Sequence, residues 1–319
     1  MPEQHPFIKF IVAIIGWMLT PFVFIFWNTV VCMPESLTLK FARTFGTLYR
    51  RRTLRMTMRN MRIILSKTDW RSTQWINLWE SHAEQAALTI FELIHLSKMS
   101  HQEIQKRITI EGEHNLKEAL ANGKGVMLFL NHLGNLTCPI FGLAVRGYRI
   151  TFVRNHVWIP FLEQKLRSIE SYIHASTVLI GKEAPELARR TFQQNGIFVC
   201  YIDFSVIPKH TVWLPFGYGQ MKVPLGPAII ALRYQVPVIC VNCIRVAHNV
   251  HRVVIYPPLQ YHNGSDIHCD AQDLLQQSLQ LVESDVQAHP EQWWLWNYAQ
   301  IRPVEKALPQ LTTQSIVER

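Results

Sequence analysis

The chain has 319 residues, enough for one large domain or two small ones with a core that needs no disulfide bonds. Hydrophobic residues make up 48% of the chain, charged residues only 17%, and the formal net charge is +9. With 10 tryptophans, this composition favours an anionic membrane surface, because indole rings settle at the level of lipid headgroups. A nucleic-acid binder would need basic and aromatic residues interleaved along a groove, and we predict no nucleic-acid partner.

Near its N-terminus the chain has a long apolar segment, residues 8–32, in which no charge follows Lys9 until Glu35. Such a segment can cross a hydrocarbon layer of ~30 Å at ~1.5 Å per residue. Pro21 would kink or break a helix near the middle. A spanning helix and a broken segment lying in one leaflet both remain open. We predict a membrane anchor over residues 1–35.

A basic cluster follows this apolar segment and contains few acids. Its members are Arg43, Arg50, Arg51, Arg52, Arg55, Arg59, Arg62 and Lys67. Positive charge beside an apolar segment indicates the cytoplasmic side and a surface for anionic lipid headgroups. A solvated helix face is the simpler interpretation, but the adjacent anchor favours lipid.

The six cysteines lie mostly in apolar surroundings, which predicts buried free thiols in a reducing compartment. Cys240 and Cys243 have the spacing of zinc ligands, but no second Cys or His pair follows at the distance that a zinc motif requires. We therefore predict no metal site and no cofactor.

Short apolar strands alternate with amphipathic helices from about residue 73 onward. The predicted strands are 108–110, 126–130, 149–153, 178–180, 197–202, 236–244 and 253–256. The predicted helices are 73–98, 113–122, 138–146, 161–171, 186–194 and 271–287. This alternation predicts an α/β fold with a mostly parallel central sheet flanked by helices. Because composition does not change after residue 70, we predict one domain over residues 36–310 and a tail over 311–319.

The strand at 126–130 ends abruptly in Asn131-His132, followed by Gly134-Asn135. Ligands of open α/β sheets bind outside the carboxyl ends of the strands. His132 therefore stands where chemistry is expected, although a core or capping histidine is the alternative. Asp203 ends the strand at 197–202 in the same way.

Several blocks in a fixed order carry a family resemblance. They are the His132 turn, Arg154 after the next strand, Ile202-Asp203, Leu214-Pro-Phe-Gly217, Val223–Ala231, and Pro290–Trp296. Together they resemble the lipid A biosynthesis acyltransferases of the lysophospholipid acyltransferase superfamily. The resemblance implies a glycerol-3-phosphate acyltransferase-like sheet with an N-terminal membrane helix. It also implies a bacterial inner membrane location with the catalytic domain on the cytoplasmic face.

The resemblance implies transfer of a fatty acyl chain from an acyl-carrier-protein thioester to a hydroxyl of a lipid A precursor or related anionic glycolipid. His132 would be the general base, with a carboxylate orienting its ring. The residues expected at the substrate are Asn131, Gly134, Asn135, Arg154, Phe216 and Gly217. Backbone N–H groups of the Gly134-Asn135 turn, or Arg154, would stabilise the oxyanion, and Arg154 also suits a lipid phosphate.

The chain departs from the family pattern at Thr137. The family has an acidic residue at this position, five residues after the histidine, and this chain has threonine. Thr137 can accept a hydrogen bond from the ring but carries no charge. Asp203, and after it Glu170, are the candidates to replace the missing acid. The alternative is a catalytically impaired relative of this family that binds lipid or has a regulatory role. A thioester or lipid hydrolase is disfavoured because the chain lacks a Gly-x-Ser-x-Gly elbow.

Overall fold

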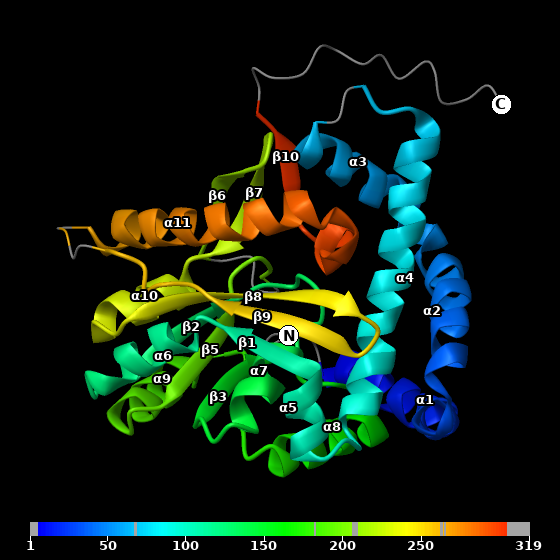
Figure 1. Ribbon diagram of the computed structural model, residues 1–319, viewed down its shortest axis with the longest axis horizontal. Helices are drawn as coiled ribbons and strands as arrows, with labels where there is room; N and C mark the ends of the chain where they lie inside the picture. The colour runs from blue at the N-terminus through cyan, green and yellow to red at the C-terminus, as the bar shows by residue number, and fades with distance from the viewer. Residues whose placement is uncertain are drawn as a thin grey trace.

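The computed structural model describes residues 6–304, except 67–68, 182, 206–209, 262–263 and 265. The predicted tail at 311–319 lies outside the described residues. Seven strands form the main sheet in the order β1-β9-β8-β2-β5-β3-β4 (Figure 1). Their bounds are Ile108–Glu111 (β1), Val126–Leu130 (β2), Ile150–Arg154 (β3), Ser176–Leu179 (β4), Ile197–Tyr201 (β5), Val238–Ala247 (β8) and Val250–Ile255 (β9).

All neighbouring strands of this sheet are parallel except β8 and β9, which form an antiparallel hairpin. The strand β2 lies in the middle, between β5 and β8. The predicted mostly parallel α/β fold is confirmed. Because β2, β5 and β3 are parallel neighbours, their carboxyl ends meet at one edge of the sheet.

Two hydrophobic cores cover the two faces of the sheet, as expected for strands buried on both sides. Alternate residues of β2 divide between them, with Met127 and Phe129 in one core and Val126, Leu128 and Leu130 in the other. The first core includes helices α9 (Ala184–Gln193), α10 (Gly226–Tyr234) and α11 (Ile267–Ala288). The second includes α5 (His101–Arg107), α6 (Glu113–Ala121), α7 (Cys138–Ala144) and α8 (Pro160–Tyr172).

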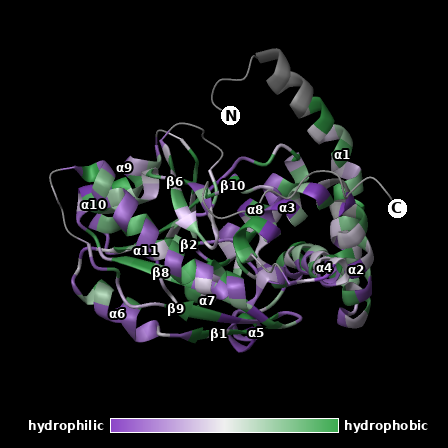
Figure 2. Ribbon diagram, turned by 90° about the horizontal axis from the view of Figure 1, so that it is seen from above, coloured by the Kyte–Doolittle hydropathy of each residue, from purple (hydrophilic) through white to green (hydrophobic). Residues whose placement is uncertain are grey.

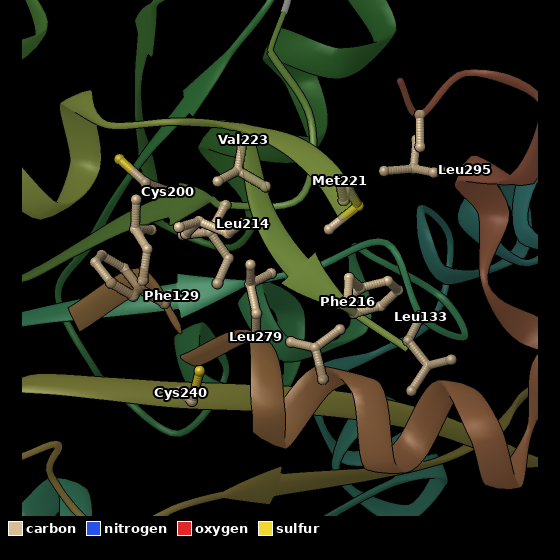
Figure 3. Packing of buried hydrophobic residues seen from close by; sticks show 14 of the residues in the cluster. Phe129, Leu133, Cys200, Leu214, Phe216, Met221, Val223, Cys240, Leu279 and Leu295 are labelled. Atoms are coloured by element: carbon tan, nitrogen blue, oxygen red, sulfur yellow. The ribbon is translucent and has the colours of Figure 1, made fainter. Parts of the chain in front are cut away.

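A small antiparallel sheet, absent from the predicted elements, lies beyond α11. It has the order β10-β7-β6, with bounds Thr211–Phe216 (β6), Gly219–Pro224 (β7) and Ile301–Pro303 (β10). Figure 3 shows Leu214, Phe216, Met221 and Val223 of this sheet converging with Leu279 of α11 on the first core. Its strands bring the blocks around Phe216 and the C-terminal tryptophans together.

The predicted N-terminal anchor is a continuous helix, α1 (Pro6–Cys32), which runs through Pro21. A break at Pro21, one of the expected outcomes, is therefore not found. By length and composition, Ile14–Cys32 is the one helix of the described chain that could cross a membrane. Trp17 and Phe22 are 67% and 70% exposed.

The last turns of α1 are covered by the domain, since Trp27 and Val30 are buried in the second core. Helix α2 (Glu35–Arg50) then runs along the long helix α4 (Ser72–Leu96), as Figures 1 and 2 show. Helix α3 (Leu54–Leu65) packs near β10. The predicted domain bounds at residues 35 and 310 stay predictions.

Candidate functional site

Three predicted site residues meet because the sheet is parallel. His132 follows the end of β2, Asp203 follows the end of β5, and Arg154 is the last residue of β3. These strands are neighbours in the order β2-β5-β3. The topology therefore gathers their side chains at the edge where open α/β sheets bind ligands.

The carboxylate of Asp203 holds His132 in a fixed orientation. Nδ1 of the ring lies 2.7 Å from Oδ1 of Asp203, and the backbone N–H of His132 donates to Oδ2 at 2.8 Å. The indole N–H of Trp293 also donates to Oδ2, at 2.9 Å. Asp203 is only 1% exposed. With Nδ1 donating to the carboxylate, Nε2 is the nitrogen that can accept a proton.

Aromatic rings and a backbone contact complete the frame around His132. The ring of Tyr201 lies 4.7 Å away between centroids, and that of Trp294 is stacked at 6.2 Å. The backbone N–H of Trp294 donates to the carbonyl of His132. The tryptophan block of Pro290–Trp296 thus contacts both His132 and Asp203. The sequence contained no signal for the bond from Trp293 to Asp203.

Thr137 does not take the place of the missing acid. Its hydroxyl donates to Oδ1 of Asn135 at 2.7 Å, and its backbone N–H donates to the same oxygen at 3.1 Å. Glu170, the second candidate, binds Arg154 at 2.6 Å and Thr177 at 2.8 Å. Asp203, the first candidate, is the carboxylate that the structure places against His132.

A cavity of about 510 Å³ opens at His132. Its wall beyond the histidine is mostly apolar and includes Leu136, Val153, Ile180, Ala184, Pro185, Cys200, Ile229 and Ile230. Arg154, Tyr201 and His210 supply polar groups to the same wall. Burial raises the pKa of the Cys200 thiol to about 12, which keeps this thiol in its neutral form. An apolar pocket with few polar groups suits a hydrocarbon chain with one reactive end.

Arg154 lies in the wall of the cavity but is already paired with two acids. Its guanidinium donates to both carboxylate oxygens of Glu163, at 2.8 and 2.9 Å, and to Glu170 at 2.6 Å. These hydrogen bonds hold the pKa of Glu163 at about 2, well below its usual value. The predicted binding of a lipid phosphate by Arg154 stays a prediction, since two carboxylates already balance its charge.

The other predicted substrate contacts brace the turn after β2. The side chain of buried Asn131 accepts from the backbone N–H of Leu133 and donates to Asn242. Gly134 has a positive φ of 61°, and a Cβ there would lie 2.4 Å from the carbonyl oxygen of Cys243. The N–H of Gly134 donates to the carbonyl of Gln292, so this donor is not available to an oxyanion.

Phe216 and Gly217 belong to the turn of the small sheet. Phe216 is fully buried and its ring lies 5.4 Å from that of Trp293. Gly217 packs on the end of α3, where a Cβ would lie 2.4 Å from the carbonyl oxygen of Ile64. Phe216 thus packs against the tryptophan that binds Asp203, and the predicted contact of both residues with substrate stays a prediction.

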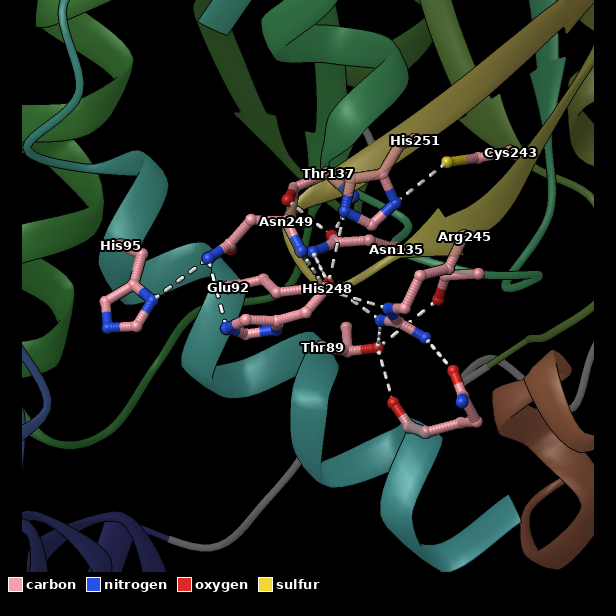
Figure 4. A network of polar contacts seen from close by, with 12 residues as sticks. Thr89, Glu92, His95, Asn135, Thr137, Cys243, Arg245, His248, Asn249 and His251 are labelled. Carbon is pink, nitrogen blue, oxygen red and sulfur yellow. Dashed lines mark hydrogen bonds and ion pairs between the residues drawn. The ribbon is translucent and has the colours of Figure 1, made fainter. Parts of the chain in front are cut away.

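A buried polar network lies behind the turn and centres on Glu92 of α4 (Figure 4). Both carboxylate oxygens of Glu92 accept from Arg245 at 2.8 Å, and Asn135 donates to one of them at 3.0 Å. Burial opposes ionisation of Glu92, but Arg245 and the neighbouring His248 and His251 outweigh it. The pKa of Glu92 therefore lies well below its usual value.

Glu92 was not predicted from the sequence, because it lies inside an ordinary amphipathic helix. It reaches the His132 turn through Asn135, whose side-chain oxygen in turn holds Thr137. Beside Glu92, Cys138, Cys243 and His251 form a cluster of side chains that could hold a metal ion. All six cysteines are free of disulfides, and four of them are buried, as predicted.

The family comparison covers nearly the whole chain. A sequence profile of the bacterial lipid A biosynthesis acyltransferases matches residues 8–299. A comparison with curated proteins gave no significant match. The matched range includes β2 with His132, β5 with Asp203 and the tryptophan block. The chain therefore belongs to the bacterial lipid A biosynthesis acyltransferase family.

Proposed function

We propose that this protein is an active acyltransferase that moves a fatty acyl chain from acyl carrier protein to a hydroxyl of a lipid A precursor, with His132 as general base. The observation that carries this proposal is the bond between His132 Nδ1 and Asp203 Oδ1 beside an apolar cavity. A carboxylate on Nδ1 fixes the ring tautomer and stabilises the imidazolium that forms during proton transfer. Asp203 thus supplies the charge that Thr137 lacks.

The proposed reaction uses one proton transfer in each direction. Nε2 of His132 takes the proton of the acceptor hydroxyl while its oxygen attacks the thioester carbonyl carbon. The tetrahedral intermediate then collapses, the carbon–sulfur bond breaks, and the imidazolium returns the proton to the departing thiolate. The products are an ester on the acceptor and a free thiol on the carrier protein, so atoms and charge balance.

The cavity is the proposed site of the acyl chain. Its apolar wall includes Val153, Ile229 and Ile230, and His132 stands at its polar end. Removal of apolar surface from water stabilises a bound chain by about 25 cal/mol for each Å² buried. A chain seated there would bring its carbonyl end towards Nε2 of His132.

Membrane association supports a lipid acceptor. The family acts on a membrane lipid, and α1 exposes Trp17, Phe22 and other large apolar side chains. We infer that this surface enters the inner membrane with the catalytic domain on the cytoplasmic face, where acyl carrier protein is available. The basic residues after α1 would then face anionic headgroups.

The deciding experiment compares wild type with His132→Ala as full-length protein in detergent or liposomes. Acyl-carrier-protein thioester and a lipid A precursor are supplied, and mass spectrometry follows the acylated product. A positioned base contributes about 10²–10⁴ to the rate, so the variant should lose at least about a hundredfold. His268→Ala is the matched control, because His268 is exposed at the start of α11. Activity retained by a folded His132→Ala variant would contradict the proposal.

A further inference from the structure

A second cluster of reactive side chains lies inside the molecule, in the core between the main sheet and helices α4 and α7. Cys138 begins α7, Cys243 lies on β8 and His251 lies on β9. All three residues are at most 2% exposed. Their two sulfurs and one ring nitrogen lie within 4.8 Å of one another. Nδ1 of His251 is 4.0 Å from Sγ of Cys243, and Figure 4 shows these two side chains facing each other.

The strand register explains how two of the ligands meet. In the β8–β9 hairpin, Cys243 pairs with Val253 and Arg245 pairs with His251. Successive side chains of a strand alternate between the two faces, so Cys243 and His251 share the face towards α7. Cys138 belongs to α7, which packs on this face of the hairpin. It follows Thr137 directly and lies six positions after His132.

The second ring nitrogen of His251, Nε2, lies close to the carboxylate of Glu92. Nε2 of the ring lies 3.3 Å from Oε2 of Glu92. Arg245, Asn135 and the backbone N–H of Asn249 hold that carboxylate in place. A histidine that binds a metal almost always donates its other ring N–H to a carboxylate or carbonyl, which fixes the tautomer. Here Nε2 lies at ion-pair distance from Glu92 without the geometry of a hydrogen bond, and Nδ1 faces Sγ of Cys243.

We propose that Cys138, Cys243 and His251 bind Zn²⁺, with Glu92 as the partner of His251. Zinc bonds of ~2.3 Å to sulfur and ~2.0 Å to nitrogen place tetrahedral ligand atoms about 3.6–3.8 Å apart. The observed Sγ–Nδ1 distance of 4.0 Å needs a contraction of only a few tenths of an ångström. Two thiolates and a neutral imidazole balance the charge of Zn²⁺, so the site is neutral in a buried place where net charge is costly. These side chains supply three of the four tetrahedral positions.

The ion would have a structural role beside the active site. It would tie the first residue of α7 to the β8–β9 hairpin, and thereby fix the turn that runs from His132 to Cys138. This role does not depend on the acyl-transfer proposal, because metal content is measured without any substrate.

The test measures metal in the full-length protein purified without a polyhistidine tag. Cells are grown with Zn²⁺, or with Co²⁺ in its place, and metal is quantified by mass spectrometry with plasma ionisation. We expect one Zn²⁺ per chain and, for the cobalt protein, the charge-transfer absorption that thiolates give with Co²⁺. Cys243→Ser and His251→Gln should lower the metal content to background.

Cys240→Ser is the matched control, because Cys240 lies on the same strand, is equally buried and faces the other core. It should keep its metal. Wild-type protein without zinc and without cobalt–thiolate absorption overturns the proposal even if the ligand variants do not fold. A Cys138–Cys243 disulfide found by peptide mapping under non-reducing conditions also overturns it, as does full zinc content in Cys243→Ser.

Discussion

Two histidine–carboxylate pairs lie on either side of the same turn, and their surroundings differ. His132 donates to Asp203 and lines a cavity of about 510 Å³, with 12% of its side chain exposed. His251 meets Glu92 in the interior and is 1% exposed. In each pair a carboxylate lies beside one ring nitrogen, hydrogen-bonded to it at His132 and at ion-pair distance from it at His251. What lies beyond the other nitrogen decides the chemistry, an open apolar cavity in one pair and two thiols in the other.

The comparison predicts that loss of the carboxylate charge harms catalysis in the first pair and stability in the second. The largest effect is expected for Asp203→Asn. An amide keeps the shape but leaves His132 without a partner for its imidazolium, and the equivalent change in a serine protease triad costs about 10⁴ in turnover. We expect a fall in kcat of about 10³–10⁴-fold with little change in KM, measured with the acyl-transfer assay.

Asp273→Asn is the control for that substitution, because Asp273 is exposed on α11. Both variants should show the wild-type circular dichroism spectrum. If Asp203→Asn keeps more than a tenth of the wild-type kcat, Asp203 does not orient the base.

The next effect is expected for Glu92→Gln, measured as unfolding in urea. The change leaves Arg245, which is 6% exposed, without its charged partner. Breaking a buried ion pair by removing one member costs about 3–5 kcal/mol of unfolding free energy. Glu118→Gln, at an exposed position of α6, is the control and should change stability by less than about 0.5 kcal/mol. An equally stable Glu92→Gln protein would show that the network around Glu92 is not needed for the fold.

The same variant tests the pH dependence of stability. The pKa of Glu92 is lower in the folded protein than its ordinary 4.5, so its ionised form stabilises the fold at pH values above about 4.5. That contribution is lost as the pH falls from 4.5 through the lower, folded pKa. We therefore expect the difference in unfolding free energy between wild type and Glu92→Gln to shrink below pH 4.5. A difference that stays constant between pH 7 and pH 3 would contradict this assignment.

A smaller effect is expected at Trp293. It distinguishes a role of this residue in holding Asp203 from a role in binding substrate. Trp293→Phe keeps an aromatic ring in the core but removes the N–H that donates to Asp203 at 2.9 Å. A hydrogen bond to a charged group is worth about 1.5–3 kcal/mol, so kcat should fall about tenfold or more while KM stays within about twofold. Trp296→Phe, whose N–H donates to the carbonyl of Pro290, is the control and should keep its kcat. A rise in KM without a fall in kcat would assign Trp293 to substrate binding.

The sequence predicted the main sheet well because apolar strands and amphipathic helices alternate with clear periods. His132 and Asp203 could be predicted because both end apolar strands, and parallel strands end at a common edge. The bond from Trp293 could not be predicted, since it joins residues 90 positions apart through a small sheet that was not expected. The cluster of Cys138, Cys243 and His251 was missed for the same physical reason. Zinc motifs are read from short spacings, and these ligands meet only through the hairpin register and the start of a helix.

The smallest effect is expected for substitutions of Thr137. They distinguish an active enzyme from an impaired relative of the family. The hydroxyl and backbone N–H of Thr137 donate to Asn135 rather than to His132. Thr137→Val removes one hydrogen bond and should cost about 1 kcal/mol of stability and less than about threefold in kcat. Thr137→Ser keeps the hydroxyl and is the control.

Thr137→Glu gives the sharper contrast. A carboxylate at this position would face Oδ1 of Asn135, an acceptor, without the hydroxyl donor that binds it now. Because Asp203 already supplies the acid, we expect the added carboxylate to lower stability and to leave kcat unchanged or reduced. If Thr137→Glu instead creates activity in a wild-type protein that has none, then Asp203 does not replace the missing acid, and the chain is the impaired relative.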